Sequence, residues 1–153
     1  MGSTRRRTAG EVQVCAESFT LILLDTHVLV WLDNGAAELG RRSRAAIDAA
    51  YKQGALAVSA ISFWEVAMLV EKGRLEIAQD LVTWRRDLLH AGLAELPVDG
   101  EAGIMAVGLG GLHADPADRL IVAAASQRGA ELVTADQRLL DWRGPVKCRD
   151  ARR

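Results

Sequence analysis

The sequence predicts an α/β fold in which a mostly parallel sheet lies between two layers of helices. The first observation is the run Leu21–Leu24, four consecutive aliphatic residues of the kind found in strands buried on both faces. The second is that further short apolar runs alternate with amphipathic helical stretches, the pattern of strand–helix–strand units. A chain of 153 residues, half of them hydrophobic, is long enough to bury one such core without disulfide bonds.

Residues 1–18 stand apart from this pattern. They contain Arg5, Arg6 and Arg7 and show no periodicity, and the first strand-like run begins near Phe19. We expect a disordered extension, either an expression remnant or the product of an upstream start codon, followed by a single domain over residues 19–153. A basic arm that touches nucleic acid is the alternative.

The expected elements follow the chain in order, each bounded by residues that cap or break it. Gly54, Gly73, Gly92 and Gly129 mark helix ends, and Thr26 and Asp99 are expected to cap helix starts. The glycines of residues 108–111 lack the spacing of a phosphate-binding loop, so this stretch is an ordinary loop. Strands are expected at residues 21–24, 55–59, 93–98 and 131–134, and helices at 28–32, 37–53, 62–72, 78–91, after 99, around 120–125 and at 137–142, with residues 144–146 finishing the fold.

Composition excludes several classes of protein. The apolar stretches are too short for a membrane span and none follows the N-terminal arginines, so we expect a cytoplasmic protein without a secretory signal. Cys15 and Cys148 have no metal-binding spacing and are expected to be reduced thiols. The net charge of −1 argues against nucleic-acid binding by overall charge, although arginine outnumbers lysine and a local patch could grip phosphate.

Four acids are candidates for a shared site. Asp25 and Asp136 each come just past an apolar strand, while Glu65 and Asp118 lie near the starts of helices. In a parallel sheet these positions face the same edge, where open α/β sheets bind their ligands. Because clustered carboxylates repel one another unless a cation neutralises them, and oxygen donors favour Mg²⁺ or Mn²⁺, a divalent cation is expected there.

Each acid also has an ordinary structural interpretation. The spacing of Ser62 and Glu65 fits a capping box, and the run from Asp115 to Asp118 fits an N-cap, an N1 proline and an N3 acid. Asp136 alone could be a turn residue. Asp25 is harder to explain in this way, because a carboxylate at the end of a buried strand needs a partner.

Four segments resemble the acidic motifs of PIN-domain ribonucleases, in particular the VapC-type toxins of bacterial toxin–antitoxin pairs. The resemblance extends over about residues 19–148. The segments are Leu23–Trp31, Ser59–Ala67, His113–Ala123 and Leu132–Asp136. It implies a three-layer α/β/α sandwich in which the family's acids correspond to Asp25, Glu65, Asp118 and Asp136.

The resemblance further implies an Mg²⁺- or Mn²⁺-dependent endoribonuclease, in which a metal-activated water attacks an RNA phosphodiester in line. It also implies a homodimer that is inhibited by a small VapB-like antitoxin whose C-terminal segment covers the active site. Asp25, Asp118 and Asp136 would hold the metal, Glu65 would ligate it or act as base, and Asp115 is an additional acid that could ligate or cap. Thr134 could support Asp136, and Arg119 could pair with phosphate, with the acids, or in a structural salt bridge.

The remaining polar and aromatic candidates have simpler interpretations. His27 is expected to be structural or solvated, and His90 and His113 to be surface residues. The tryptophans at 31, 64 and 84 are expected in core or dimer packing rather than base stacking.

Three alternatives to the ribonuclease stay open. The first is a catalytically silent PIN-like interaction module. The others are an Mg²⁺-dependent DNA nuclease and a phosphatase of the haloacid-dehalogenase type. That last family needs an acid where this chain has His27.

Overall fold

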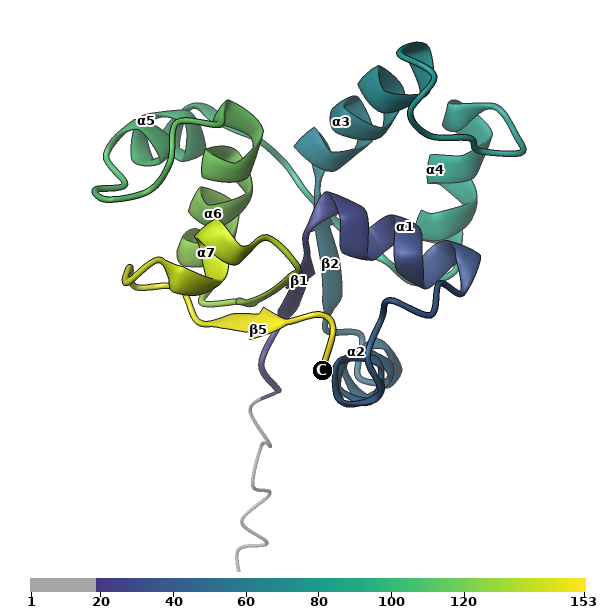
Figure 1. Cartoon of the computed structure of the whole chain (residues 1–153), viewed down its shortest axis with the longest axis horizontal. Helices are drawn as coiled ribbons and strands as arrows, with labels where there is room; N and C mark the ends of the chain where they lie inside the picture. The colour runs from purple at the N-terminus through teal and green to yellow at the C-terminus, as the bar shows by residue number, and fades with distance from the viewer. Residues whose placement is uncertain (1–18) are drawn as a thin grey trace, which may run out of the picture.

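The computed structural model describes residues 19–153, so the expectations for residues 1–18 and for Cys15 lie outside the described residues. Within that range the chain forms one five-stranded sheet and seven helices (Figure 1). The elements are β1 (Ile22–Leu24), α1 (Thr26–Asn34), α2 (Arg41–Lys52), β2 (Leu56–Ser59), α3 (Ala60–Glu71), α4 (Leu81–His90), β3 (Ala94–Leu96), α5 (Gly100–Val107), α6 (Pro116–Arg128), β4 (Glu131–Thr134), α7 (Gln137–Asp141) and β5 (Cys148–Asp150).

The sheet is buried between two groups of helices, as the sequence predicts. Because successive side chains of a strand point to opposite faces, Ile22 and Leu24 pack with α1, α2 and α4 while Leu23 packs with α6 and α7. Helix α5 packs against α6, and α3 contacts both α1 and α6. Figure 1 shows the two groups on either side of β1 and β2. The three-layer α/β/α prediction is therefore confirmed.

All strand pairs are parallel, in the order β3-β2-β1-β4-β5. The chain runs outward from β1 through β2 to β3 and then returns to the other side of β1 as β4. The connections leaving the carboxyl ends of β1 and β4 therefore diverge, which creates a crevice at this edge of the sheet. Asp25 follows β1 directly, and Asp136 lies two residues after the end of β4.

Several local predictions are confirmed and others are wrong. Asp99 and Asp115 cap α5 and α6, as expected. Asp25, and not Thr26, is the N-cap of α1. Ser59 caps α3 one turn earlier than the proposed capping box, because the helix begins at Ala60 directly after β2. Within the described residues, no helix has the length and apolar character needed to cross a membrane.

The C-terminal strand β5 is a finding that the sequence did not predict. The sequence suggested that the fold ends near Val146, whereas residues 148–150 pair with β4 and complete the sheet. Their half-buried pattern lacks the apolar signal of the inner strands. Cys148 in this strand is a free thiol whose burial raises its pKa to about 11, so it stays protonated at neutral pH.

Candidate active site

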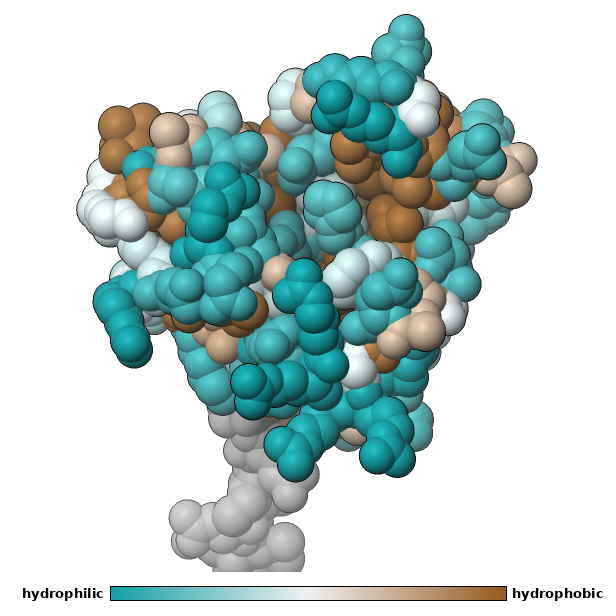
Figure 2. Space-filling view, in the orientation of Figure 1, coloured by the Kyte–Doolittle hydropathy of each residue, from teal (hydrophilic) through white to brown (hydrophobic). Residues whose placement is uncertain are grey.

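The carboxyl edge of the sheet opens into a pocket of about 340 Å³. All four acids that the sequence singled out line it, together with Asp115, so segments distant in sequence meet as expected. On the face that Figure 2 shows, the surface between the two helical groups is largely hydrophilic. The lining residues are Asp25, His27, Trp31, Glu65, Asp115, Asp118, Ala135, Asp136, Arg138 and Arg152.

Asp25 is held at the base of this pocket and is only 6% exposed. Its Oδ1 accepts a hydrogen bond of 2.8 Å from the Thr26 backbone N–H, and its Oδ2 accepts one of 2.6 Å from the Thr134 hydroxyl. Burial raises the pKa of Asp25 although both hydrogen bonds oppose that shift, and the charge of Asp136 raises it further. The carboxylate is therefore fixed in position but short of positive charge.

Glu65 reaches the pocket from the second turn of α3. Its Oε1 accepts a hydrogen bond of 2.6 Å from the buried hydroxyl of Thr26, and Ser62 Oγ lies 2.9 Å from the same hydroxyl. Since Thr26 has one hydroxyl proton and gives it to Glu65, Ser62 is the donor in the second contact. Burial raises the pKa of Glu65, and repulsion from Asp118 and Asp25 adds to the shift.

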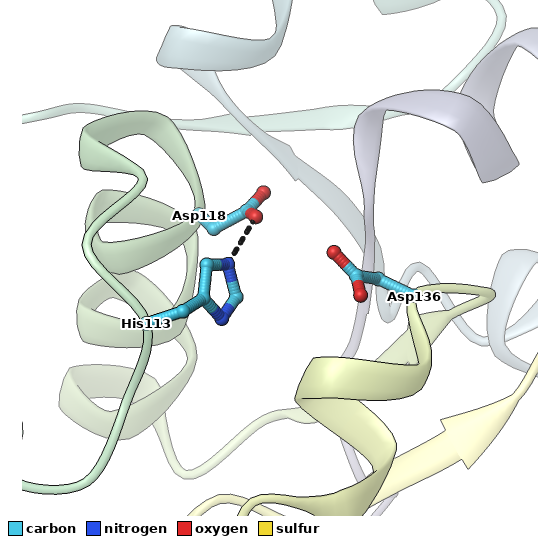
Figure 3. Close-up of side chains that lie close together, drawn as sticks. All are labelled: His113, Asp118 and Asp136. Carbon is cyan, nitrogen blue, oxygen red and sulfur yellow. Dashed lines mark hydrogen bonds and ion pairs between the residues drawn. The ribbon is translucent and has the colours of Figure 1, made fainter.

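Asp118 lies in the first turn of α6 and is 9% exposed. Its Oδ2 is 2.7 Å from His113 Nε2, and Figure 3 shows this imidazole turned toward the carboxylates of Asp118 and Asp136. Burial raises the pKa of Asp118, opposed by the His113 contact. The expectation that His113 is a surface residue is wrong, because its side chain is only 16% exposed and its Nδ1 is buried without a hydrogen-bond partner among the described residues.

Asp136 caps α7 and is paired with Arg138, a residue that the sequence analysis missed. Arg138 Nη2 lies 2.8 Å from Asp136 Oδ2, and its Nε lies 3.2 Å from Oδ1. The same Nη2 is 3.8 Å from Asp118. These hydrogen bonds lower the pKa of Asp136, in contrast to the other three acids. The sequence signal that could have revealed this pair is the position of Arg138, two residues after Asp136.

Thr134 supports Asp136 as expected and also holds Asp25, whereas the role of Arg119 differs from those expected. The hydroxyl of Thr134 supports Asp136 through the backbone of Asp136, because Thr134 Oγ1 accepts a hydrogen bond of 3.1 Å from the Asp136 N–H. The same hydroxyl donates its proton to Asp25. The guanidinium of Arg119 instead donates to the backbone carbonyls that end α5 and form the loop before Asp115. Arg119 therefore shapes that loop, and its contacts do not support pairing with phosphate or with the acids.

The tryptophans divide between the core and the surface. Trp84 is 3% exposed and packs edge-on against Phe63, so its predicted core role is confirmed. Trp31 packs against the same core and also lines the pocket. Trp64 is 53% exposed and lies outside the core.

The donors present in the pocket fit a divalent cation. Burial raises the pKa values of three of the four carboxylates, and the neighbouring hydrogen bonds and charges offset that effect only in part. A ligand atom from each of His113, Asp118 and Asp136 lies within 4.8 Å of the others. Opposite ligands of an ion with bonds of about 2.1 Å are about 4.2 Å apart, so these atoms nearly fit one coordination shell. The described residues thus include a cluster of two carboxylates and one imidazole that is suited to a divalent metal.

Comparison with known proteins agrees with this geometry. The PIN domain family matches residues 22–144. A curated relative, Ribonuclease VapC22 of Mycobacterium tuberculosis, is 39% identical over 127 residues, which cover 82% of this chain and 95% of that protein.

Solved structures with the same fold include two complexes bound to DNA. VapBC2 from Rickettsia felis, bound to a fragment of its promoter, has a TM-score of 0.63 at 19% identity and covers 85% of this chain and 98% of the matched one. VapBC from Salmonella typhimurium has a TM-score of 0.62 at 18% identity and covers 86% and 98%. FitAcB from Neisseria gonorrhoeae has a TM-score of 0.57 at 19% identity, again covering 86% and 98%.

Proposed function

Because this chain belongs to the PIN domain family, we propose that it is a metal-dependent endoribonuclease toxin of the VapC type, kept inactive by a small VapB-like antitoxin. The observation that carries the proposal is the meeting of Asp25, Glu65, Asp118 and Asp136 in one pocket. The relative named as a ribonuclease covers nearly this whole domain at 39% identity, which supports RNA as the substrate.

The cation in this proposal is Mg²⁺ or Mn²⁺, held by Asp25, Asp118 and Asp136 directly or through water. Oxygen-rich sites suit these ions. When bound there, such a cation supplies positive charge next to the cleaved phosphate and lowers the pKa of water. Asp115 is engaged as the cap of α6, with its Oδ1 accepting from the Asp118 N–H, so we assign it a structural role in placing Asp118.

The chain's own residues set the geometry of the reaction. Thr134 and the Thr26 N–H hold the two oxygens of Asp25, so this carboxylate cannot rotate away from the pocket. Glu65 is fixed through its Oε1 by Thr26, which leaves Oε2 as the oxygen that can accept a proton from the attacking water. Burial raises the pKa of Glu65, and a raised pKa makes a carboxylate a better base near neutral pH.

The partners in the proposal are an antitoxin and a second copy of this chain. The solved VapBC and FitAcB structures are complexes of the same fold, which supports an antitoxin of the VapB type. We propose that a C-terminal segment of that antitoxin covers the acidic pocket and that the toxin is a homodimer. Because the proposed substrate is RNA, we propose that the toxin acts in the cytoplasm.

The experiment measures RNA cleavage by purified full-length protein that has been freed of any partner. We expect cleavage with Mg²⁺ or Mn²⁺, none in EDTA, and none by Asp25→Asn, which keeps the size of the side chain. The matched control is Asp48→Asn, the same change at an exposed position of α2. Cleavage that persists in EDTA would reject the metal mechanism, and a folded wild-type protein that leaves RNA intact with either metal would favour a silent interaction module.

A further inference from the structure

A second hollow, of about 460 Å³, lies beside the acidic pocket and is lined by four arginines. We call these the arginine cluster: Arg41 and Arg42 at the start of α2, and Arg152 and Arg153 at the C-terminal end of the chain. All four side chains are exposed. The chain as a whole carries a net charge of −1, so this concentration of positive charge is local.

The backbone that carries the cluster is firmly placed. The C-terminal segment lies against the start of α2, where the Ser43 N–H donates 2.7 Å to the Arg153 carbonyl and the Gly40 N–H donates 2.9 Å to the Ala151 carbonyl. The approach at Gly40 is so close that a Cβ there would lie 2.4 Å from the Arg152 backbone. Flexible side chains are therefore presented from a fixed surface formed by two segments distant in sequence.

Among the described residues, only Arg153 of the cluster has an acidic partner. Arg41 and Arg42 form no ion pair with the described residues, and Arg153 reaches only Asp150, at 3.4 Å. The N-terminus of α2 adds the positive end of a twelve-residue helix to the same hollow. The three arginines of the cluster without an acidic partner among the described residues require an anionic partner or counterions.

Arg152 connects this hollow to the acidic pocket, because it lines both. Its Nη1 donates a hydrogen bond of 2.7 Å to the carbonyl of Ala135, the residue immediately before Asp136. The guanidinium is thereby held at the rim of the acidic pocket, and its remaining N–H groups form no hydrogen bond with the described part of the chain. An anionic chain that reacts in the pocket would pass directly onto the arginine cluster.

We propose that the arginine cluster binds the backbone phosphates of single-stranded RNA on one side of the bond that is cleaved. This inference rests on the proposed function. Guanidinium groups bind phosphate oxygens through two parallel hydrogen bonds, and phosphate contacts position a nucleic acid without reading its sequence. The cluster therefore holds the substrate in register with the acids and leaves sequence preference to other surfaces.

RNA fits this surface better than a protein partner does. The surface around α2 and the C-terminus is hydrophilic (Figure 2), whereas protein interfaces need a buried apolar centre. The exposed apolar side chain of α2, Tyr51, lies at the opposite end of that helix from the cluster. Other exposed apolar side chains lie on α3, α4 and α5, namely Trp64, Val82, Ile104 and Val107. An acidic peptide of an antitoxin is the competing occupant, and the test below separates the two.

The test measures binding of a short fluorescein-labelled single-stranded RNA by fluorescence anisotropy, over about 50 to 200 mM salt. Full-length Asp25→Asn protein with Mg²⁺ is the background, so that the RNA stays intact. The variants are Arg152→Gln and the pair Arg41→Gln with Arg42→Gln. Arg74→Gln and Arg128→Gln are matched controls, since both arginines are exposed and lie outside the cluster.

Each lost phosphate contact should lower the slope of log affinity against log salt by about 0.7. At about 0.1 M salt this corresponds to roughly fivefold weaker binding for Arg152→Gln and roughly 25-fold for the pair. In the active protein, the same changes should raise the KM for RNA more than they lower kcat, because the acids are untouched. The two controls should bind RNA as the background protein does.

Unchanged affinity and salt slope in the cluster variants would overturn the proposal, even if the wild-type protein cleaves RNA. Unchanged RNA binding together with loss of a co-purified partner protein would also overturn it and assign the cluster to protein docking. If the wild-type protein fails to cleave RNA at all, the proposed function fails instead. Cleavage and binding therefore report on the two proposals separately.

Discussion

Replacing Thr134 with valine should destabilise the protein because it removes hydrogen bonds at the acidic pocket, and not because it changes packing in the core. The hydroxyl of Thr134 is fully buried, donates to Asp25 Oδ2 at 2.6 Å and accepts from the Asp136 N–H at 3.1 Å. Valine has nearly the same shape, so the change removes two hydrogen bonds without opening a cavity. It leaves a buried carboxylate oxygen and a backbone N–H without these partners.

The magnitude follows from these two contacts. A hydrogen bond to a charged group contributes about 1.5–3 kcal/mol and a neutral one about 1 kcal/mol, so we expect the free energy of unfolding to fall by about 3 kcal/mol. For a protein of this size, that lowers Tm by roughly 6–12 °C. Because the hydroxyl also lowers the pKa of Asp25, the valine variant should raise that pKa further.

The assay is urea unfolding in EDTA, followed by circular dichroism, which gives the free energy without any contribution from a bound ion. Thr20→Val is the matched control, because Thr20 is exposed and should change stability by less than about 0.5 kcal/mol. A Thr134→Val protein as stable as the wild type would refute the reasoning. It would show that Asp25 does not depend on this hydroxyl in the folded state.

Three further predictions concern charge, metal and packing. Glu131→Gln should lower the free energy of unfolding by about 1–2 kcal/mol at neutral pH. Burial opposes ionisation of this carboxyl, but the ion pairs with Lys147 and Arg149 outweigh burial and lower its pKa overall. That contribution to stability is present above the ordinary pKa near 4.3 and is lost as the pH falls through the lower pKa of the folded state, so the difference in stability from the wild type should vanish in acid. The control, Glu101→Gln at an exposed position, should be as stable as the wild type at every pH. Mg²⁺ should raise Tm by an amount that grows as the pH increases above about 4. The reason is that the raised pKa values of Asp25, Glu65 and Asp118 make ionisation of the metal-free protein costly between the ordinary and the raised values. A rise in Tm that is equal in acid and at neutral pH would contradict this prediction. Gly40→Ala should lower stability by about 1–3 kcal/mol in thermal unfolding, since its Cβ meets the backbone of the C-terminal segment, while Gly103→Ala, with open space around it, should not.

The fold was predictable because the inner strands carry strong local signals. The run around Leu23 is apolar on both faces, and the glycines that follow several helices mark their ends. Strand β5 was missed because residues 148–150 lie at the edge of the sheet, where half-buried polar side chains replace the apolar run. Edge strands are specified by pairing with a neighbour that only the folded chain provides.

The meeting of the acids was also predictable, since the ends of parallel strands share one edge. The residues that pair with these acids were not predictable. His113 and Arg138 reach Asp118 and Asp136 because of how the loop before α6 and the start of α7 are oriented, which spacing alone does not give. The capping-box interpretation of Glu65 failed for a similar reason, because Ser59 at the end of β2 begins the helix earlier.

Crystals soaked with Mn²⁺ would test the central claim most directly, through the anomalous signal of the ion. We predict a strong peak inside the acidic pocket, within bonding distance of carboxylate oxygens of Asp25 and Asp118, and its loss in Asp118→Asn crystals. A pocket without any such peak at saturating Mn²⁺, or a peak bound only elsewhere on the surface, would contradict a nuclease site built from these acids.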